Sequence, residues 1–262
     1  MRTGGLICAL LTLLAADAAC ANDIAVALTD SVVEVDAGFA GARIVLFGAV
    51  EGLAAPANEA SPYDIVAVLR GPDADFRIRP MERRGLIWTR GPGIRVEGAP
   101  GFYIVAATQP VEDFAPPDLR RALEIGAAHL DIAARLDASD GRAREVLARH
   151  GAQALTEAFL EAGRETGRFR EIAGAVAFHK GPLFSIAIDL PPTTPIGEYE
   201  ARVYLIRDGE AIAQDSAALS VDKVGIERRI YDLAHQRPIA YGLFCVAMSL
   251  GAGWLAAAAF RK

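Results

Sequence analysis

The sequence predicts a mainly β protein with a helical insertion (α+β): strands of an immunoglobulin-like antiparallel sandwich, followed by one C-terminal transmembrane helix. Three observations predict this class. Short alternating apolar runs separated by Gly, Pro and Asp fill residues 22–115 and 169–222. Helical spacing replaces this alternation over about residues 117–167, and a long apolar run without charged residues follows from residue 239.

The first 21 residues have the three-part pattern of a secretory signal peptide. Arg2 precedes an apolar run over residues 6–16, and the small residues Ala19 and Ala21 follow it. We therefore expect cleavage after Ala21. The alternative is a lipidated Cys20, although the residue three positions before it is Asp17 rather than a hydrophobic residue.

Residues 22–115 are predicted to form a β-sandwich-like region. In the segment FRIR, Phe76 and Ile78 point to one face of a strand while Arg77 and Arg79 point to the other. The turn sequences GP, GPG and APG separate this run from its neighbours, as expected for many short strands.

Residues 116–168 are predicted to be a helical insertion or linker. Pro117 and Asp118 are typical of a helix start, and Leu119 and Leu123 share one helical face. We expect two or three helices over 117–167, with a break near residues 138–141.

Strand spacing returns over residues 169–222. Phe184, Ile186, Ile188 and Leu190 alternate with more polar neighbours, and Asp208-Gly209 between two apolar runs indicates a tight hairpin. This region either completes the first sandwich or forms a second small β domain joined by a helical linker.

The C-terminal part predicts a membrane anchor. Residues 223–238 have helical apolar spacing, which fits either a juxtamembrane helix on the outer leaflet or a short connecting helix. Residues 239–260 contain no Asp, Glu, Lys or Arg and would form a helix of about 33 Å, close to the bilayer hydrocarbon thickness of about 30 Å. Together with the signal peptide, this span predicts a single-pass bacterial inner-membrane protein, with a periplasmic N-terminal domain and residues 261–262 as a cytoplasmic tail.

Composition narrows the partners and the compartment. The formal net charge is -6, so nucleic acid is not an expected partner. The three cysteines are Cys8 and Cys20 in the signal region and Cys245 in the span, so we expect no disulfide in the exported domain. A cysteine-free exported domain of this length fits a bacterial periplasm.

The sequence contains no recognisable catalytic pattern. None of the four histidines (His129, His150, His179 and His235) has metal-ligand spacing with another. Phosphate-binding loops, nucleophile elbows and dinucleotide fingerprints are also missing from the sequence. We therefore assign no catalytic, cofactor-binding or metal-binding residue, expect no cofactor, and leave open whether the protein is an enzyme.

Two sets of residues are candidate contact sites. The first is a basic patch around one tryptophan, suited to an anion or an acidic partner; its members are Arg77, Arg79, Arg83, Arg84, Trp88 and Arg90. The alternative is the solvated face of an edge strand. The second is a set of small residues four apart in the predicted span, which would let a partner helix approach closely; its members are Ala247, Ser249, Gly251, Gly253 and Ala257.

Four segments occur in order after the signal peptide: VEVDAGFAGARIVLFGA, GPDADFRIRPMERRGLIWTRG, FYIVAAT, and VGIERRIYDLAHQRPIAYG leading into the span. In this order of features the chain resembles, over nearly its whole length, an uncharacterised family of alphaproteobacterial transmembrane proteins. The resemblance implies an inner-membrane protein and supplies no active-site residues. It also favours a transporter as the partner.

These observations favour a membrane-anchored periplasmic binding or accessory protein that works with an integral membrane partner such as a transporter. One alternative is a periplasmic hydrolase or carbohydrate-active module, which would need carboxylates gathered in a cleft. The other is a structural envelope protein.

Overall fold

The structure is a computed structural model that describes residues 23–36, 38–51, 63–223 and 238–259. The side chains of Arg84 and of residues 239–240, 243–244 and 255–259 are also outside the described part. The predicted signal peptide, the lipidation alternative at Cys20, the cytoplasmic tail and all but the end residues of the predicted juxtamembrane helix lie outside the described residues.

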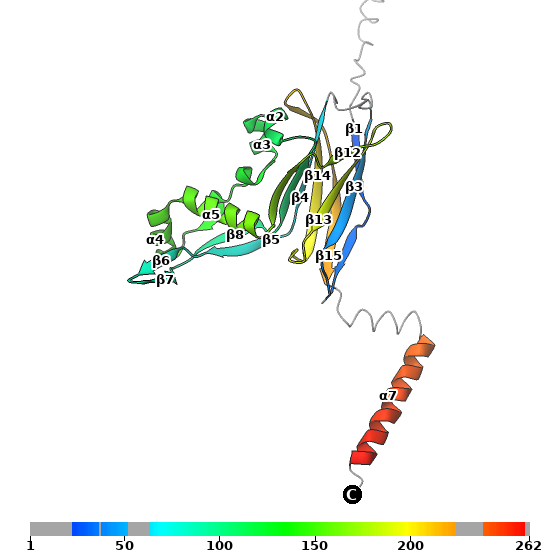
Figure 1. The fold of residues 1–262 in the computed structure, drawn as a ribbon. Helices are drawn as coiled ribbons and strands as arrows, with labels where there is room; N and C mark the ends of the chain where they lie inside the picture. Colours follow the sequence, from blue (N-terminus) through cyan, green and yellow to red (C-terminus); the bar gives the residue numbers. More distant parts are fainter. Residues whose placement is uncertain (1–22, 37, 52–62, 224–237, 260–262) are drawn as a thin grey trace, which may run out of the picture.

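Two β-sheets face each other across one apolar core (Figure 1). The smaller, four-stranded sheet has the order β1 (Asp23–Leu28), β3 (Ala42–Glu51), β13 (Leu183–Leu190) and β12 (Val176–Phe178). The larger, six-stranded sheet has the order β11 (Phe169–Ala173), β9 (Tyr103–Ala107), β4 (Asp64–Arg70), β14 (Gly197–Arg207), β15 (Glu210–Lys223) and β2 (Val32–Val35). We call these two sheets the sandwich.

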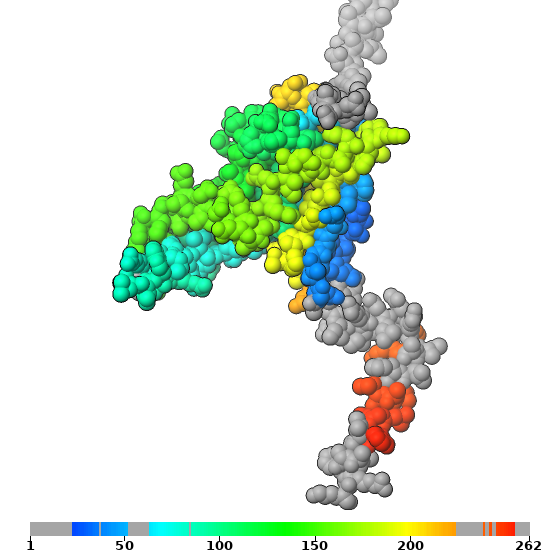
Figure 2. All heavy atoms as spheres, viewed as in Figure 1, coloured from blue at the N-terminus to red at the C-terminus, as the bar shows by residue number. Residues whose placement is uncertain are grey.

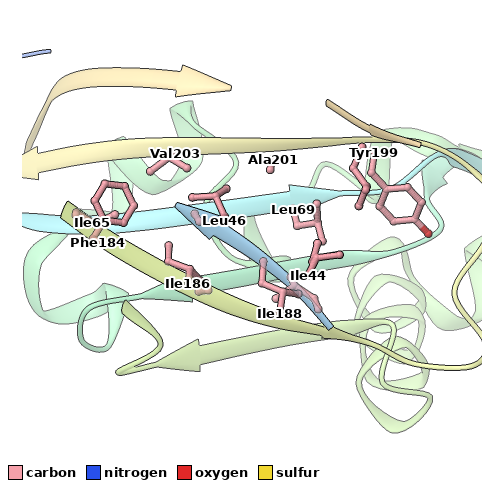
Figure 3. Close-up of a cluster of buried hydrophobic side chains, with 14 of the residues drawn as sticks. Ile44, Leu46, Ile65, Leu69, Phe184, Ile186, Ile188, Tyr199, Ala201 and Val203 are labelled. Atoms are coloured by element: carbon pink, nitrogen blue, oxygen red, sulfur yellow. The ribbon is translucent and has the colours of Figure 1, made fainter. Parts of the chain in front are cut away.

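The sandwich core is built from alternate residues of its strands, because successive side chains of a strand point to opposite faces. The predicted alternation from Phe184 to Leu190 is confirmed, since all four of its apolar side chains are buried. They pack with Ile44 and Leu46 of β3 against residues of β4 and β14 in the facing sheet (Figure 3).

Strands from before and after the helical segment pair directly. β4 lies between β9 and β14 in the larger sheet, and β3 pairs with β13 in the smaller one. Most pairs are antiparallel, but β11 pairs parallel to β9 and β15 parallel to β2. The chain is therefore mainly β, as predicted, whereas the finer immunoglobulin-like assignment is not confirmed.

The outer face of the six-stranded sheet carries a second core. Val66 and Val68 of β4 and Val105 of β9 pack there against Ile125 and Leu160. The helical elements that follow β9 along the chain are α2 (Val111–Phe114), α3 (Pro117–Ala122), η1 (Ala127–His129), η2 (Ala133–Arg135), α4 (Gly141–His150) and α5 (Ala152–Glu165). The break predicted near residues 138–141 is confirmed, because Asp140 caps α4 by accepting a hydrogen bond from Arg142 N at 3.0 Å.

A lobe projects from this face of the sandwich (Figure 2). It contains α4, α5, the three-stranded sheet β10 (Leu136–Asp137), β8 (Ile94–Pro100) and β5 (Asp73–Ile78), and the hairpin β6 (Met81–Arg84) and β7 (Ile87–Arg90). The sequence analysis grouped the strands around Phe76 and Trp88 with the sandwich. Alternation reveals that a segment is a strand, but not which sheet it joins, and the structure places these strands in the lobe.

The last described element is α7 (Pro238–Ala259). The residues predicted to span the membrane, 239–260, are therefore confirmed as helical to within one residue at each end, whereas their assignment as a membrane span is not confirmed. Among the residues that the structure describes, no helix combines the length and the hydropathy required of a membrane span.

Candidate interaction site

The hairpin of β6 and β7 forms the far end of the lobe (Figures 1 and 2). Its loop consists of Gly85 and Leu86. Gly85 has a φ of 66°, and the first loop residue of a type II′ turn requires such a positive φ. At the base, Gly91 N donates a hydrogen bond to Pro80 O at 2.9 Å. The hairpin is thus closed at both ends by its own backbone.

Four large apolar side chains of this hairpin face solvent. Leu86 is 93% exposed, Trp88 65%, Ile87 64% and Met81 55%. Single exposed apolar residues are ordinary on protein surfaces, but a group of them within ten residues is a candidate interaction site. Of these four residues, the patch predicted from the sequence contains only Trp88. The consecutive run Leu86-Ile87-Trp88 after the turn glycine is a signal for Leu86 and Ile87, whereas Met81 has none.

Basic residues share one face of the hairpin with two of these apolar residues. The register pairs Arg83 with Trp88 and Met81 with Arg90, and paired residues in a two-stranded ribbon lie on the same face. Arg83 Nε also donates to Gly85 O at 3.1 Å, which directs this side chain toward the loop. Tryptophan and arginine are the residues most enriched at the centres of protein interfaces.

The opposite face of the hairpin is tied to α4. Glu82 Oε1 lies 2.8 Å from Arg149 Nη1, and Arg149 also pairs with Glu145 within α4 at 2.6 Å. The position of Glu82 requires a glycine at residue 91. A side chain on residue 91 would clash, because its Cβ would lie 2.7 Å from Glu82 Cδ. One face of the hairpin is therefore held by the lobe while the other remains available.

The remaining members of the predicted basic patch lie apart from this face. Arg77 in β5 and Arg79 just after it both pack over Gly93. A Cβ on Gly93 would lie 2.9 Å from the Cγ atom of each arginine. Arg84 lies in β6 opposite Ile87, and its side chain is outside the described residues. The structure thus brings together Arg83, Trp88 and Arg90 and groups Arg77 with Arg79 separately.

A groove of about 440 Å³ lies between β5 and α5. Residues 76–80 line one side, and α5 contributes Ala154, Ala158 and Ala162 to the other. Arg168, just before β11, also lines the groove. The sequence does not predict this groove, because its two walls are more than seventy residues apart in the chain and a single sequence gives no sign of that contact.

Arg168 is held by aromatic rings rather than by a carboxylate. Its guanidinium carbon lies 4.6 Å from the Phe76 ring centroid and 5.5 Å from that of Phe169. Its Nε donates to Thr166 Oγ1 at 3.1 Å, whereas its buried Nη1 has no hydrogen-bond partner among the described residues. Burial lowers the pKa of the Arg168 guanidinium, and no described carboxylate offsets this effect.

The predicted helix-contact residues all lie on α7. Ala247, Ser249, Gly251 and Gly253 are exposed, while the side chain of Ala257 lies outside the described part. A Cβ on Gly251 or Gly253 would meet no other atom within 4 Å. Ser249 Oγ donates to Cys245 O at 2.8 Å, so its polar group is satisfied within the helix.

In the described part of the chain, no three His, Cys, Asp or Glu residues are grouped closely enough to hold a metal ion.

The fold and site together define a β-sandwich protein with a projecting basic and apolar lobe and a charge-free C-terminal helix. The chain belongs to the family described as "Putative transmembrane protein (Alph_Pro_TM)", whose match covers residues 23–262. A search of curated proteins finds no match.

Proposed function

We propose that this protein is a membrane-anchored accessory protein whose periplasmic domain binds an integral membrane partner, such as a transporter, through the β6–β7 hairpin. The observation that carries this proposal is the exposure of Met81 and Trp88 beside Arg83 and Arg90 on one face of the hairpin, with Leu86 exposed in the loop. An apolar surface edged by arginine suits a partner with an apolar pocket and acidic residues around it.

The proposed location is the bacterial inner membrane, with α7 as a single C-terminal span. α7 is 22 residues long and contains no charged residue, and the family is described as transmembrane. The family match begins at residue 23, close after the predicted signal cleavage at Ala21. A cleaved signal peptide followed by one span would place the domain in the periplasm and the C-terminus in the cytoplasm.

A second contact of the same partner is proposed on α7. Ala247 and Gly251, and Ser249 and Gly253, are each four residues apart, and such small residues let two helices approach closely in a membrane. The hairpin and α7 would then bind one partner at two points, and the overall affinity would exceed that of either contact alone because the second contact forms within the complex. The hydrolase alternative needs carboxylates gathered in a cleft. Asp73, Glu198 and Glu200 line a second pocket beside β14, whereas the groove beside β5 is lined by apolar and basic residues.

Site-specific photocrosslinking of the full-length chain in spheroplasts tests this proposal. A benzoylphenylalanine at Leu86 should give one discrete product with an integral membrane protein. The same group at Phe47, an exposed apolar residue of the sandwich, is the matched control and should give none. Replacing Arg83 and Arg90 by Glu should abolish the Leu86 product, because the charge of the hairpin face is reversed.

Two outcomes would contradict the proposal. Equal products from Leu86 and Phe47 would show that the hairpin is not a selective surface. Resistance of the domain to proteinase K added outside intact spheroplasts would contradict the periplasmic location.

A further inference from the structure

The groove between β5 and α5 runs along an open strand edge. β5 pairs with β8 on one side, and no other described strand pairs with its second edge. Side chains of a strand alternate between its two faces, so the consecutive residues Phe76, Arg77 and Ile78 of β5 line one groove together where it follows the strand edge. Arg79 and Pro80 extend the lining after the strand ends. The outward backbone groups of β5 have no described strand partner and are available for pairing.

The opposite wall leaves space for an added strand. Ala154, Ala158 and Ala162 follow one another at four-residue intervals on α5 and are exposed. Behind them, Leu155 and Phe159 are buried and give the groove an apolar floor. A helix with small side chains beside an open strand edge is the arrangement in which extended peptides add to a sheet.

Charge defines what this groove would accept. Arg77, Arg79, His150 and Arg168 line it, and no Asp or Glu does so among the described residues. Arg168 lacks a carboxylate partner in the described chain, and its Nη1 lacks a hydrogen-bond acceptor. An unpaired guanidinium at a groove wall favours a carboxylate on the ligand.

We infer that this groove binds an extended peptide segment of a partner protein, with apolar alternate side chains and a carboxylate that pairs with Arg168. The segment adds to the free edge of β5 as a further strand. An acyl chain with an anionic head would match the floor and the charge, but it would leave the backbone groups of β5 without hydrogen bonds in a desolvated groove. The site is separate from the hairpin, so its test does not depend on the function proposed above.

The test uses the full-length protein in lipid nanodiscs and a fluorescein-labelled hexapeptide pool. Four positions of the pool are random mixtures of Val, Ile, Leu and Thr, and its C-terminus is a free carboxylate. Fluorescence anisotropy should show saturable binding, and the same pool with a C-terminal amide should bind about tenfold more weakly because it loses the charged pair with Arg168. In the Arg168→Gln variant the two pools should bind equally.

Ala158→Trp fills the groove from an exposed position and should weaken binding of the carboxylate pool at least about tenfold. Gln153→Trp introduces the same side chain on α5 outside the groove lining and should leave binding unchanged. Circular dichroism of each variant checks that the fold is retained.

Three results would overturn the inference. Unchanged binding to Ala158→Trp would place the peptide elsewhere. Equal binding of a pool that is N-methylated at alternate backbone positions would exclude strand addition. Binding of dodecanoate that requires Arg168, without binding of any peptide pool, would make the groove an acyl-chain site instead.

Discussion

The sandwich and the lobe use the same residue types in opposite ways. In β13 every second residue is apolar and buried against the facing sheet. In the hairpin the apolar side chains of Met81, Ile87 and Trp88 face solvent. Burial of the sandwich side chains stabilises the fold, whereas the hairpin side chains gain little from folding. The exposed hairpin side chains are therefore the surface on which the proposed partner contact rests.

One arginine from each region shows a related difference. On the sandwich, Arg43 Nε lies 2.6 Å from Asp189 Oδ1, and this hydrogen-bonded pair lowers the pKa of the Asp189 carboxyl. In the lobe, Arg168 lies on aromatic rings without a described carboxylate partner. The sandwich satisfies this surface charge internally, while the lobe presents a cation to its groove.

The largest expected effect comes from the sandwich core. Phe184→Ala should lower the free energy of unfolding by about 3–5 kcal/mol, because a fully buried aromatic side chain leaves a cavity. The site packs tightly, since a Cβ on Gly48 would lie 2.2 Å from Phe184 Cζ. Urea unfolding of the full-length protein in nanodiscs, followed by circular dichroism, measures the change.

The matched substitution in the lobe is Trp88→Ala. It should change the free energy of unfolding by no more than about 0.5 kcal/mol, since the side chain is mostly solvated. A loss similar to that of Phe184→Ala would break the comparison, because the hairpin would then be part of a core.

A middle-sized effect is expected from two buried tyrosines, one in each core. Tyr103 packs in the outer core, where its hydroxyl donates to Glu124 O and accepts from Gly126 N at 3.1 Å. Tyr199 packs in the sandwich, and its hydroxyl donates to Pro195 O at 2.6 Å. Tyr103→Phe should cost about 1–3 kcal/mol because it leaves a buried donor unpaired, and Tyr199→Phe about 0.5–1.5 kcal/mol.

The same tyrosines predict alkaline sensitivity. Burial raises the pKa of both hydroxyls above the ordinary value of about 10. A raised pKa in the folded state means that their contribution is fully present below about pH 10 and is lost as the pH rises through the folded pKa. Urea midpoints measured from pH 8 to 11 should fall less steeply in Tyr103→Phe than in the natural protein. An unchanged slope in both variants would assign the alkaline loss to other groups.

Hairpin loops and helix limits could be predicted from the sequence where residues close together in the chain determine them. Asp208 and Gly209 form the predicted hairpin loop, with φ values of 51° and 81° that suit a two-residue turn. α7 was predictable because a helix of this composition needs no partner to define its limits. The sheet that each strand joins was not predictable, because pairing such as β3 with β13 depends on residues about 140 positions apart.

The residues of the candidate site also fall into two groups: those that nearby sequence identifies and those that only the folded chain identifies. Arg83, Trp88 and Arg90 were identifiable because they lie within one short segment. Arg168 was not, because its role depends on Phe76 and α5, which only the folded chain brings beside it. Residue types thus indicated a basic aromatic surface, while the groove required the tertiary structure.

The smallest expected effect concerns the link between the hairpin and α4. Glu82→Gln removes the charge that faces Arg149, and exposed or partly exposed ion pairs contribute only about 0.2–1 kcal/mol. We expect faster amide hydrogen exchange in residues 81–90 and unchanged exchange in the sandwich, because the hairpin is a separate two-stranded sheet.

Glu145→Gln is the matched control, because Glu145 binds the same arginine from within α4. It should leave exchange in the hairpin unchanged. If Glu82→Gln also accelerated exchange in β3 or β13, the hairpin and the sandwich would open as one unit. Substitutions in the hairpin would then also destabilise the sandwich. The contrast between a stabilising sandwich and a hairpin that only presents a surface would fail at the hairpin, the proposed binding surface.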